Sequence, residues 1–285
     1  ELVSYGFDAR SRRSVAAETV CDALVCLGEA PPDDIVRRVV VKVGPAPAPG
    51  ETKVDAALPP PAHPIQIAAR LRALLRLTVL ESVARLRETD AAGFGVRPAR
   101  LAEVERKPVI LYVGPGDPAF LSLRHALKEA GVDMVAAFST FNAFDYLHER
   151  PFDAVVLNAA DDPDTAHTVC SAMRRNTRLY HTPALIMSRD EVYPHADEAF
   201  ARGASDILPA RLEPTKFRAR VLALADERRR RREAKAVLES VRIDPLLDRE
   251  TDLFTSEFGV KHLESIVSVS EDSFGPFSVV CLRAG

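Results

Sequence analysis

The chain has 285 residues, which suggests about two domains, and 47% of them are hydrophobic, enough for ordinary packed cores. Charged residues make up 28% and the net charge is −3, so no global bias favours nucleic acid or an anionic membrane. No apolar run approaches the roughly 18 residues that a membrane span needs. The cysteines lack metal-ligand spacing and disulfide-scaffold density, which indicates small buried side chains in a reducing, cytoplasmic compartment. They are Cys21, Cys26, Cys170 and Cys281.

Residues 1–90 carry the pattern of a partial α/β domain. Two apolar runs, residues 21–27 and 39–43, have the length of buried strands, and a helical pattern follows them. Residues 44–64 are rich in proline and alanine, so we expect a loop there in place of regular structure. Residues 91–106 are the predicted linker to the next domain.

Residues 107–240 alternate short apolar runs with helix-period segments, a pattern typical of a parallel sheet wrapped by helices. The expected strands cover residues 109–113, 132–138, 154–157, 184–187 and 206–208. Five strands and five helices predict one flavodoxin-like domain with a parallel five-stranded sheet. The last helix starts at Pro214 and can continue to Val241, a length that suits a projecting linker helix.

Five consecutive arginines, residues 228–232, lie in this last helix. The expected role is a solvated helix surface, and a phosphate- or partner-binding patch is the alternative.

An internal repeat connects the two α/β segments. Residues 64–74 match residues 214–224, and residues 21–27 match residues 152–158 in pattern. The identities in the first pair are Pro64/Pro214, Ala69/Ala219, Arg70/Arg220, Ala73/Ala223 and Leu74/Leu224. The N-terminal segment is therefore predicted to be a second copy of the same fold, without its first strand and helix.

Residues 107–240 resemble the receiver (CheY-like) domains of two-component response regulators, and the repeat makes residues 1–90 resemble a degenerate receiver. The resemblance implies a site at the strand ends. An acidic pair holds Mg²⁺, an aspartate accepts the phosphoryl group, and a hydroxyl and a lysine contact its oxygens. The metal and the fixed donors neutralise the charge that develops on the phosphoryl group.

The residues at these positions do not suit phosphoryl transfer. The second copy has Gly114 and Pro115 for the acidic pair, Asn158 for the acceptor, Ser188 for the hydroxyl and Ala210 for the lysine. Asp117 lies near the acidic pair but is shifted, and a neutral amide is a poor nucleophile. In the first copy the acceptor position falls on Leu27. Both copies are therefore predicted to be pseudo-receivers, with no catalytic residue and no bound metal.

Two further groups of polar residues receive structural interpretations. The acidic residues in 161–164 are expected to form a loop and a helix N-cap rather than a metal site. His125, His148, His167 and His195 show no metal-ligand spacing, so we expect surface or hydrogen-bonded side chains.

The resemblance also implies a homodimer. In receiver domains the face formed by the fourth helix, the fifth strand and the fifth helix commonly dimerises. Phe200, Phe217, Val221 and Leu224 would lie on that face and are the predicted interface to a second copy or a protein partner.

Residues 241–285 resemble the start of a GGDEF (diguanylate cyclase) domain. Asp248, Thr251, Leu253 and Phe258 match the motif that opens its first helix. Residues 277–282 match its first core strand, and Arg283 stands where the first acidic metal ligand should follow, which would oppose Mg²⁺ binding. The chain starts at Glu1 without methionine and stops inside this pattern, so we expect it to be part of a longer protein.

The order of receiver, receiver, long helix and GGDEF start resembles the PleD class of diguanylate cyclases. The altered sites imply a member that binds cyclic di-GMP without synthesising it, an adaptor that recruits proteins in regulated proteolysis or at a cell pole during the bacterial cell cycle. No cofactor is expected in residues 1–285, and cyclic di-GMP only if the nucleotide site follows them. Two alternatives stay open: an active, receiver-regulated diguanylate cyclase acting on GTP, and a DNA-binding or other output regulator.

Overall fold

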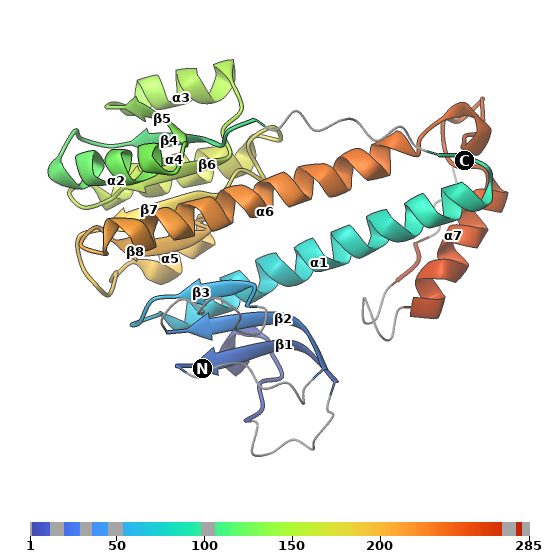
Figure 1. The fold of residues 1–285 in the computed structure, drawn as a ribbon, viewed down its shortest axis with the longest axis horizontal. Coiled ribbons are helices and arrows are strands. Elements are labelled where there is room, and N and C mark those ends of the chain that lie inside the picture. Colours follow the sequence, from blue (N-terminus) through green and yellow to red (C-terminus); the bar gives the residue numbers. More distant parts are fainter. Residues whose placement is uncertain are drawn as a thin grey trace. The chain divides into compact units, whose positions relative to one another are not determined.

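A computed structural model describes residues 2–11, 20–28, 36–44, 54–97, 106–269 and 278–280 of the chain. The chain divides into two compact units, each built from separate stretches of sequence (Figure 1). The first unit joins Glu1–Leu75 with Glu105–Arg229, and the second joins Arg76–Val104 with Arg230–Gly285.

The first unit contains a five-stranded parallel sheet in the order β5-β4-β6-β7-β8. The strands are β4 (Val109–Val113), β5 (Asp133–Ala137), β6 (Ala154–Asn158), β7 (Ala184–Ser188) and β8 (Asp206–Pro209). The helices that alternate with them are α2 (Pro118–Glu129), α3 (Thr140–Glu149), α4 (Pro163–Arg175), α5 (Ala196–Ala201) and α6 (Pro214–Ser240). Counted along this segment the order is 2-1-3-4-5, that of the flavodoxin-like fold. The predicted α/β class and parallel five-stranded sheet are confirmed.

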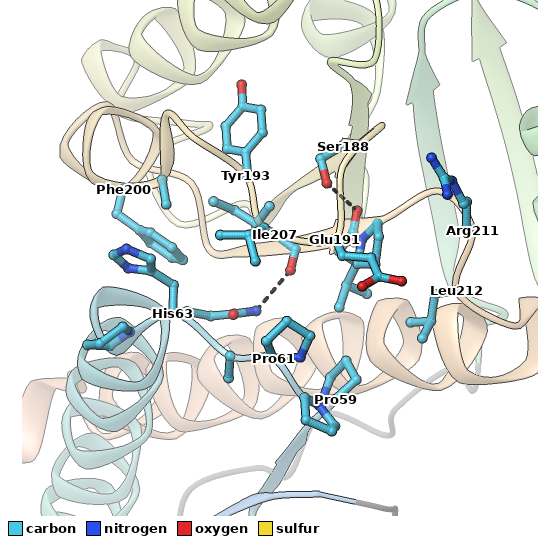
Figure 2. Close-up of a pocket in the computed structure, with 18 of the residues that line it drawn as sticks. Pro59, Pro61, His63, Ser188, Glu191, Tyr193, Phe200, Ile207, Arg211 and Leu212 are labelled. Atoms are coloured by element: carbon cyan, nitrogen blue, oxygen red, sulfur yellow. Dashed lines mark hydrogen bonds between the residues drawn. The ribbon is translucent and has the colours of Figure 1, made fainter.

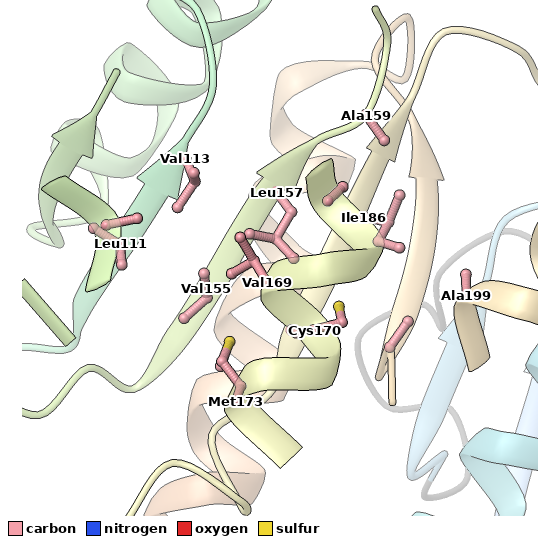
Figure 3. Packing of buried hydrophobic residues seen from close by; sticks show 14 of the residues in the cluster. Leu111, Val113, Val155, Leu157, Ala159, Val169, Cys170, Met173, Ile186 and Ala199 are labelled. Carbon is pink, nitrogen blue, oxygen red and sulfur yellow. The ribbon is translucent and has the colours of Figure 1, made fainter. Parts of the chain in front are cut away.

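Each face of this sheet carries its own core, because successive side chains of a strand point to opposite faces. Leu111 and Val155 pack with α3, α4 and α5 on one face (Figure 3). Ile110 and Val156 pack with α2 and α6 on the other. Strands covered on both sides need continuous apolar runs, which is why these strands were readable from the sequence.

Phe217, Val221 and Leu224 belong to the second of these cores. All three are buried against strands β4, β6, β7 and β8 together with α2. Their spacing of four and three residues places them on the face of α6 that covers the sheet. The prediction that these three side chains form a dimer interface is therefore corrected: they hold α6 to its own sheet.

The N-terminal segment of the first unit forms a smaller, three-stranded parallel sheet in the order β1-β2-β3. A short helix, η1 (Leu2–Tyr5), precedes it, and its elements are β1 (Val20–Leu27), β2 (Val36–Val43), β3 (Ala56–Leu58) and α1 (Pro64–Gly93). Strand β3 corrects the expectation of a loop throughout residues 44–64. Ala56 and Leu58 are buried beside β2, and this burial outweighs the proline-rich composition around them. Helix α1 also runs through the start of the predicted linker, residues 91–93.

The two sheets of the first unit repeat each other in register. Leu27 pairs with Val43 as Asn158 pairs with Met187. The next amide continues the match: Gly28 N donates to Val43 O at 2.8 Å, and Ala159 N donates to Met187 O at 2.9 Å. The order β1-β2-β3 followed by α1 thus matches β6-β7-β8 followed by α6, in line with the sequence repeat. That the N-terminal segment is a second receiver stays a prediction.

The carboxylate of Asp206 joins the two copies inside the first unit. Asp206, in β8, is fully buried and accepts hydrogen bonds from Gln66 of α1 at 2.6 Å and from Arg220 Nε of α6 at 2.9 Å. Gln66 also donates to the Ile207 carbonyl oxygen at 2.9 Å. Arg70, which matches Arg220 in the repeat, is buried and pairs with Glu227 of α6.

The second unit contains the ends of α1 and α6, the short helix η3 (Asp244–Leu246) and α7 (Ser256–Val269). Phe258 of α7 is fully buried with Ala91, Val96, Val241 and Leu246. Asp90 of α1 accepts from Ser265 at 2.7 Å and lies 2.7 Å from His262 Nδ1.

The segment that resembles a GGDEF start contains the expected helix but not, in its described part, the expected strand. Asp248 accepts hydrogen bonds from the Thr251 amide and hydroxyl, which closes the turn before α7. Residues 278–280 lie in no strand, and the rest of that prediction, with Arg283, lies outside the described residues. No helix in the described ranges has the length and apolar character to span a membrane.

Substitution Asp206→Asn should lower the free energy of unfolding by about 3–5 kcal/mol, because Arg220 would remain buried without its counter-charge. Urea denaturation measures the change. Asp145→Asn, at an exposed carboxylate on α3, is the matched control and should change it by less than about 0.5 kcal/mol. A loss no larger than that of the control would show that Asp206 does not hold these elements together.

Candidate functional site

A cavity of about 300 Å³ lies where β4, β5 and β6 end. Strands β4 and β6 flank the position at which the strand order of this fold reverses, and ligands of open α/β sheets bind outside the strand ends at such positions. The lining residues are Val113, Gly114, Pro115, Phe138, Ser139, Thr140, Leu157, Asn158, Asp161, Asp162, Thr165, Ala166 and Val169. The structure thus brings together Gly114, Pro115 and Asn158, three of the predicted site residues.

The amide of Asn158 is engaged on both sides within the protein. Its Nδ2 donates to the Tyr112 hydroxyl at 2.9 Å and to Asp117 Oδ2 at 3.0 Å, and its Oδ1 accepts from the Ala160 amide at 3.0 Å. The two amide hydrogens are therefore both used. The Asn158 side chain is thus fixed in one orientation by the protein, and neither amide hydrogen is available to a ligand.

Tyr112 and Asp117 complete this network. The Tyr112 hydroxyl is buried under the site and donates to the Pro115 carbonyl oxygen at 2.9 Å. Burial raises the pKa of Tyr112 to about 12; the Asn158 hydrogen bond lowers it and the charge of Asp117 raises it further. The hydroxyl thus stays a neutral donor at physiological pH. Asp117 accepts from the Phe120 amide at 2.8 Å and caps α2.

Gly114 stands at the first acidic position and leaves no room for a side chain. Its φ is +149°, and an added Cβ would lie 2.5 Å from Asn158 Cβ and 3.2 Å from the Tyr112 hydroxyl. Both the backbone conformation and the contact therefore require glycine. Among the described residues, no group of three or more His, Cys, Asp or Glu side chains is placed to hold a metal ion.

The remaining predicted positions lie outside this cavity. Ser188 is buried, and its hydroxyl donates to the Asp190 carbonyl oxygen at 2.8 Å, so it stabilises the loop after β7. Ala210 is half-buried against the apolar cluster that includes α6. Leu27, at the matching end of β1 in the first copy, is 73% exposed. Neither copy offers an acceptor carboxylate at the end of its matching strand.

The acidic residues after β6 form a helix cap, as predicted. Asp162 accepts from the Thr165 amide at 3.0 Å and caps α4. Hydrogen bonds from Thr165 hold the pKa of Asp162 below its usual value. Its neighbour Asp161 is exposed and pairs with Arg189.

A second cavity, of about 370 Å³, lies beside β8 in the first unit (Figure 2). Its mainly apolar walls include Pro59, Pro61 and His63 from the segment before α1, and Tyr193, Phe200 and Ile207 from the second copy. Phe200 is half-buried at this cavity, and its role in an interface to a partner stays a prediction.

Part of the arginine run makes contacts within the chain. Arg228 Nε donates to the Phe152 carbonyl oxygen at 3.0 Å, and Arg230 makes two hydrogen bonds to Glu81, of 2.7 and 2.8 Å. Arg229 pairs with Asp226 on the same helix. These contacts favour a structural role over a phosphate-binding patch. They also differ from the expected solvated surface, because Arg228 and Arg230 bind groups on other elements of the chain.

His167 differs from the predicted surface or fully hydrogen-bonded histidine. It is buried in α4, with Nε2 3.1 Å from the Tyr193 hydroxyl, and its Nδ1 has no hydrogen-bond partner. Burial is the main cause that lowers its pKa; Glu198 opposes this effect, while Arg202 and His195 add to it, and Asp164 opposes it weakly. His167 is therefore a neutral side chain in the folded protein near pH 7.

Solved structures similar to this chain are receiver domains. A response regulator from Thermotoga maritima is 17% identical, with 42% of this chain and 99% of that chain covered and a TM-score of 0.39. A chemotaxis response regulator of Vibrio cholerae is 21% identical, with 41% and 99% covered and a TM-score of 0.38. The receiver domain of a sensor histidine kinase from Pseudomonas aeruginosa, solved with a coordinated magnesium ion, is 11% identical, with 42% and 99% covered and a TM-score of 0.39. No family model and no curated protein sequence matches the chain.

Substitution Asn158→Asp should lower the free energy of unfolding by about 1–3 kcal/mol at pH 7.5. A carboxylate there would face the Asp117 carboxylate at the 3.0 Å now spanned by a hydrogen bond. Two adjacent carboxylates repel each other, and this repulsion raises the pKa of one of them. The loss of unfolding free energy is therefore full above that pKa and becomes smaller as acid protonates the pair. Urea denaturation at pH 7.5 and pH 4.5 measures it, with Asn142→Asp at an exposed position as the control. An equal loss at both pH values would argue against repulsion.

The stability of the protein should fall as the pH decreases through 6.5, in part because of His167. Its pKa in the folded state lies below the unfolded value of about 6.5. The unfolded chain therefore binds the proton first, and the contribution of His167 is complete above pH 6.5 and is lost below it. Between pH 8 and pH 5.5 the free energy of unfolding, measured by urea denaturation, should depend less on pH in His167→Gln than in the original protein. The difference in slope should be up to about 1.4 kcal/mol per pH unit. Parallel curves for the two proteins would contradict this assignment.

Proposed function

We propose that this chain is a non-catalytic module of the response-regulator class that acts by binding proteins and does not depend on phosphorylation. The observation that carries the proposal is the network around Asn158. The position that would accept a phosphoryl group holds an amide whose hydrogens bind Tyr112 and Asp117. The fold supports the class, since the 2-1-3-4-5 strand order is the one in which a strand-end site is expected at this place.

Phosphoryl transfer needs positive charge at the site and an in-line nucleophile. Here Gly114 excludes an acidic metal ligand, the lysine position holds Ala210, and Ser188 donates to the loop after β7. These residues support the proposal that the site lacks an acidic metal ligand, a nucleophile and a cation, and that the role of the domain is recognition.

Within that class, the chain resembles PopA-like members of the PleD group, which combine receiver and GGDEF segments. Support comes from the N-terminal repeat and from α7, whose buried Phe258 and preceding Asp248 turn stand at positions of the GGDEF motif. Binding of cyclic di-GMP, recruitment to a cell pole and a part in regulated proteolysis or the cell cycle rest on this resemblance alone. The alternative of an active diguanylate cyclase depends on residues at and after Arg283.

The proposed partners are proteins. The N-terminal segment contacts the five-stranded domain through Gln66 and Asp206, which supports the proposal that surfaces of this fold bind one another. A homodimer would use other surfaces, because the apolar residues of α6 first considered for that role lie in the core.

Incubation with beryllofluoride and Mg²⁺, or with acetyl phosphate and Mg²⁺, should leave the intact mass and the melting temperature unchanged within error, because no acceptor carboxylate or metal cluster is formed at the site. Mass spectrometry and thermal denaturation measure the two effects. Asn158→Asp should remain unmodified as well, since Gly114 still excludes the acidic pair. A covalent adduct at Ser188 or Asp117, or stabilisation by beryllofluoride, would refute the proposed function.

A further inference from the structure

Two phenylalanines expose most of their surface near the Asn158 cavity: Phe138 lines it, and Phe141 follows the lining residue Thr140 in the sequence. Phe138, directly after β5, lines the cavity and is 61% exposed, and Phe141, in the first turn of α3, is 75% exposed. The Phe138 ring packs edge-on against Phe120 with the centroids 5.6 Å apart. Exposed aromatic rings at the rim of a cavity supply a large apolar contact area to a partner that enters it.

The cavity itself suits an apolar side chain. Val113, Leu157, Ala166 and Val169 form much of its wall. Its polar floor, Asn158, already donates both amide hydrogens within the protein, so these donors are not available to a ligand. At about 300 Å³ it has the size of a small ligand pocket.

Negative charge lies on another part of the same lining. Asp161 and Asp162 are both exposed, and the lowered pKa of Asp162 keeps it charged near neutral pH. The pair of Asp161 with Arg189 is exposed on both sides, so a cation from a partner can replace Arg189 at little cost. The charge therefore complements a lysine or arginine.

We propose that this cavity binds a peptide segment of a protein partner, with one aliphatic or aromatic side chain in the cavity beside Phe138 and Phe141 and a basic residue against Asp161 and Asp162. The inference deepens the proposed function and rests on it, since the site must be free of phosphoryl chemistry. Aromatic anchors in a pocket with a charged rim are typical of the residues that carry most of the binding free energy of an interface.

Backbone amide NMR of the full chain, titrated with synthetic peptides, tests the proposal. The probe is the blocked peptide GSRLRSG, with GSELESG to reverse the charge and GSRGRSG to remove the apolar side chain. GSRLRSG should give saturable shifts at residues 114, 138 and 161, with an affinity about tenfold or more above that of either control peptide.

Variants locate the contact. Phe141→Ser and the double substitution Asp161→Asn, Asp162→Asn should each weaken GSRLRSG by about tenfold, a typical loss for an interface anchor. Asparagine is also a good N-cap, so α4 should keep its cap in the double variant. Val260→Ser removes a side chain that is 57% exposed in the second unit and should leave the affinity unchanged.

The outcomes separate this proposal from the proposed function. Absence of saturable shifts at the cavity, or equal binding of the three peptides, would overturn the peptide site. A dimer that Phe141→Ser dissociates would assign the surface to a second copy of the chain and would also overturn it. In these cases the proposed function stands, because the beryllofluoride experiment judges it independently.

Discussion

The buried carboxylate of Asp206 is the interaction on which the arrangement of the first unit depends. It lies in the last strand of one sheet and accepts hydrogen bonds from Arg220 of the helix that follows and from Gln66 of the first copy. A buried ion pair contributes little net stability compared with apolar residues of the same size, because both charges lose their hydration. What such polar contacts do contribute is specificity, since a shifted α1 would separate the buried Arg70 from Glu227 and Gln66 from Asp206. The two segments of the first unit are therefore joined both by these polar groups and by apolar contacts such as that of Ile65 with the core on one face of the five-stranded sheet.

Hydrogen bonds between polar side chains also determine the structure at the strand ends of the five-stranded sheet. Parallel strands bring Tyr112 and Asn158 to neighbouring positions, and the turn after β4 adds Asp117. Three polar side chains, a carbonyl oxygen and two backbone amides then form hydrogen bonds with one another. A network of this kind is rigid because every member has a partner. Ligands of this fold usually bind at this strand-end position, and here the hydrogen-bonded network forms the fixed floor of the cavity. Side chains around it, such as Phe138, remain exposed.

Sequence reasoning succeeded where local pattern decides structure. The five strands of the larger sheet are continuous apolar runs because helices cover both faces, and the predicted cap in residues 161–164 is Asp162, which caps α4. Sequence reasoning failed where the outcome depends on which distant residues a segment contacts. The spacing of Phe217 and Val221 shows an apolar helix face but not that a sheet covers it, and β3 is too short to stand out from its prolines. The Tyr112–Asn158 hydrogen bond joins residues 46 apart in sequence, and no spacing rule reveals it.

Gly114 limits the substitutions that this site can accept. With its backbone at a φ of +149° and Asn158 Cβ where its own Cβ would be, it tolerates no replacement that leaves the neighbouring strand end in place. An aspartate at 158 alone would face the Asp117 carboxylate, and an acid at 114 alone would require the turn after β4 to be rebuilt. A change of chemistry at this strand end therefore needs coupled substitutions, whereas exposed positions around it can change one at a time.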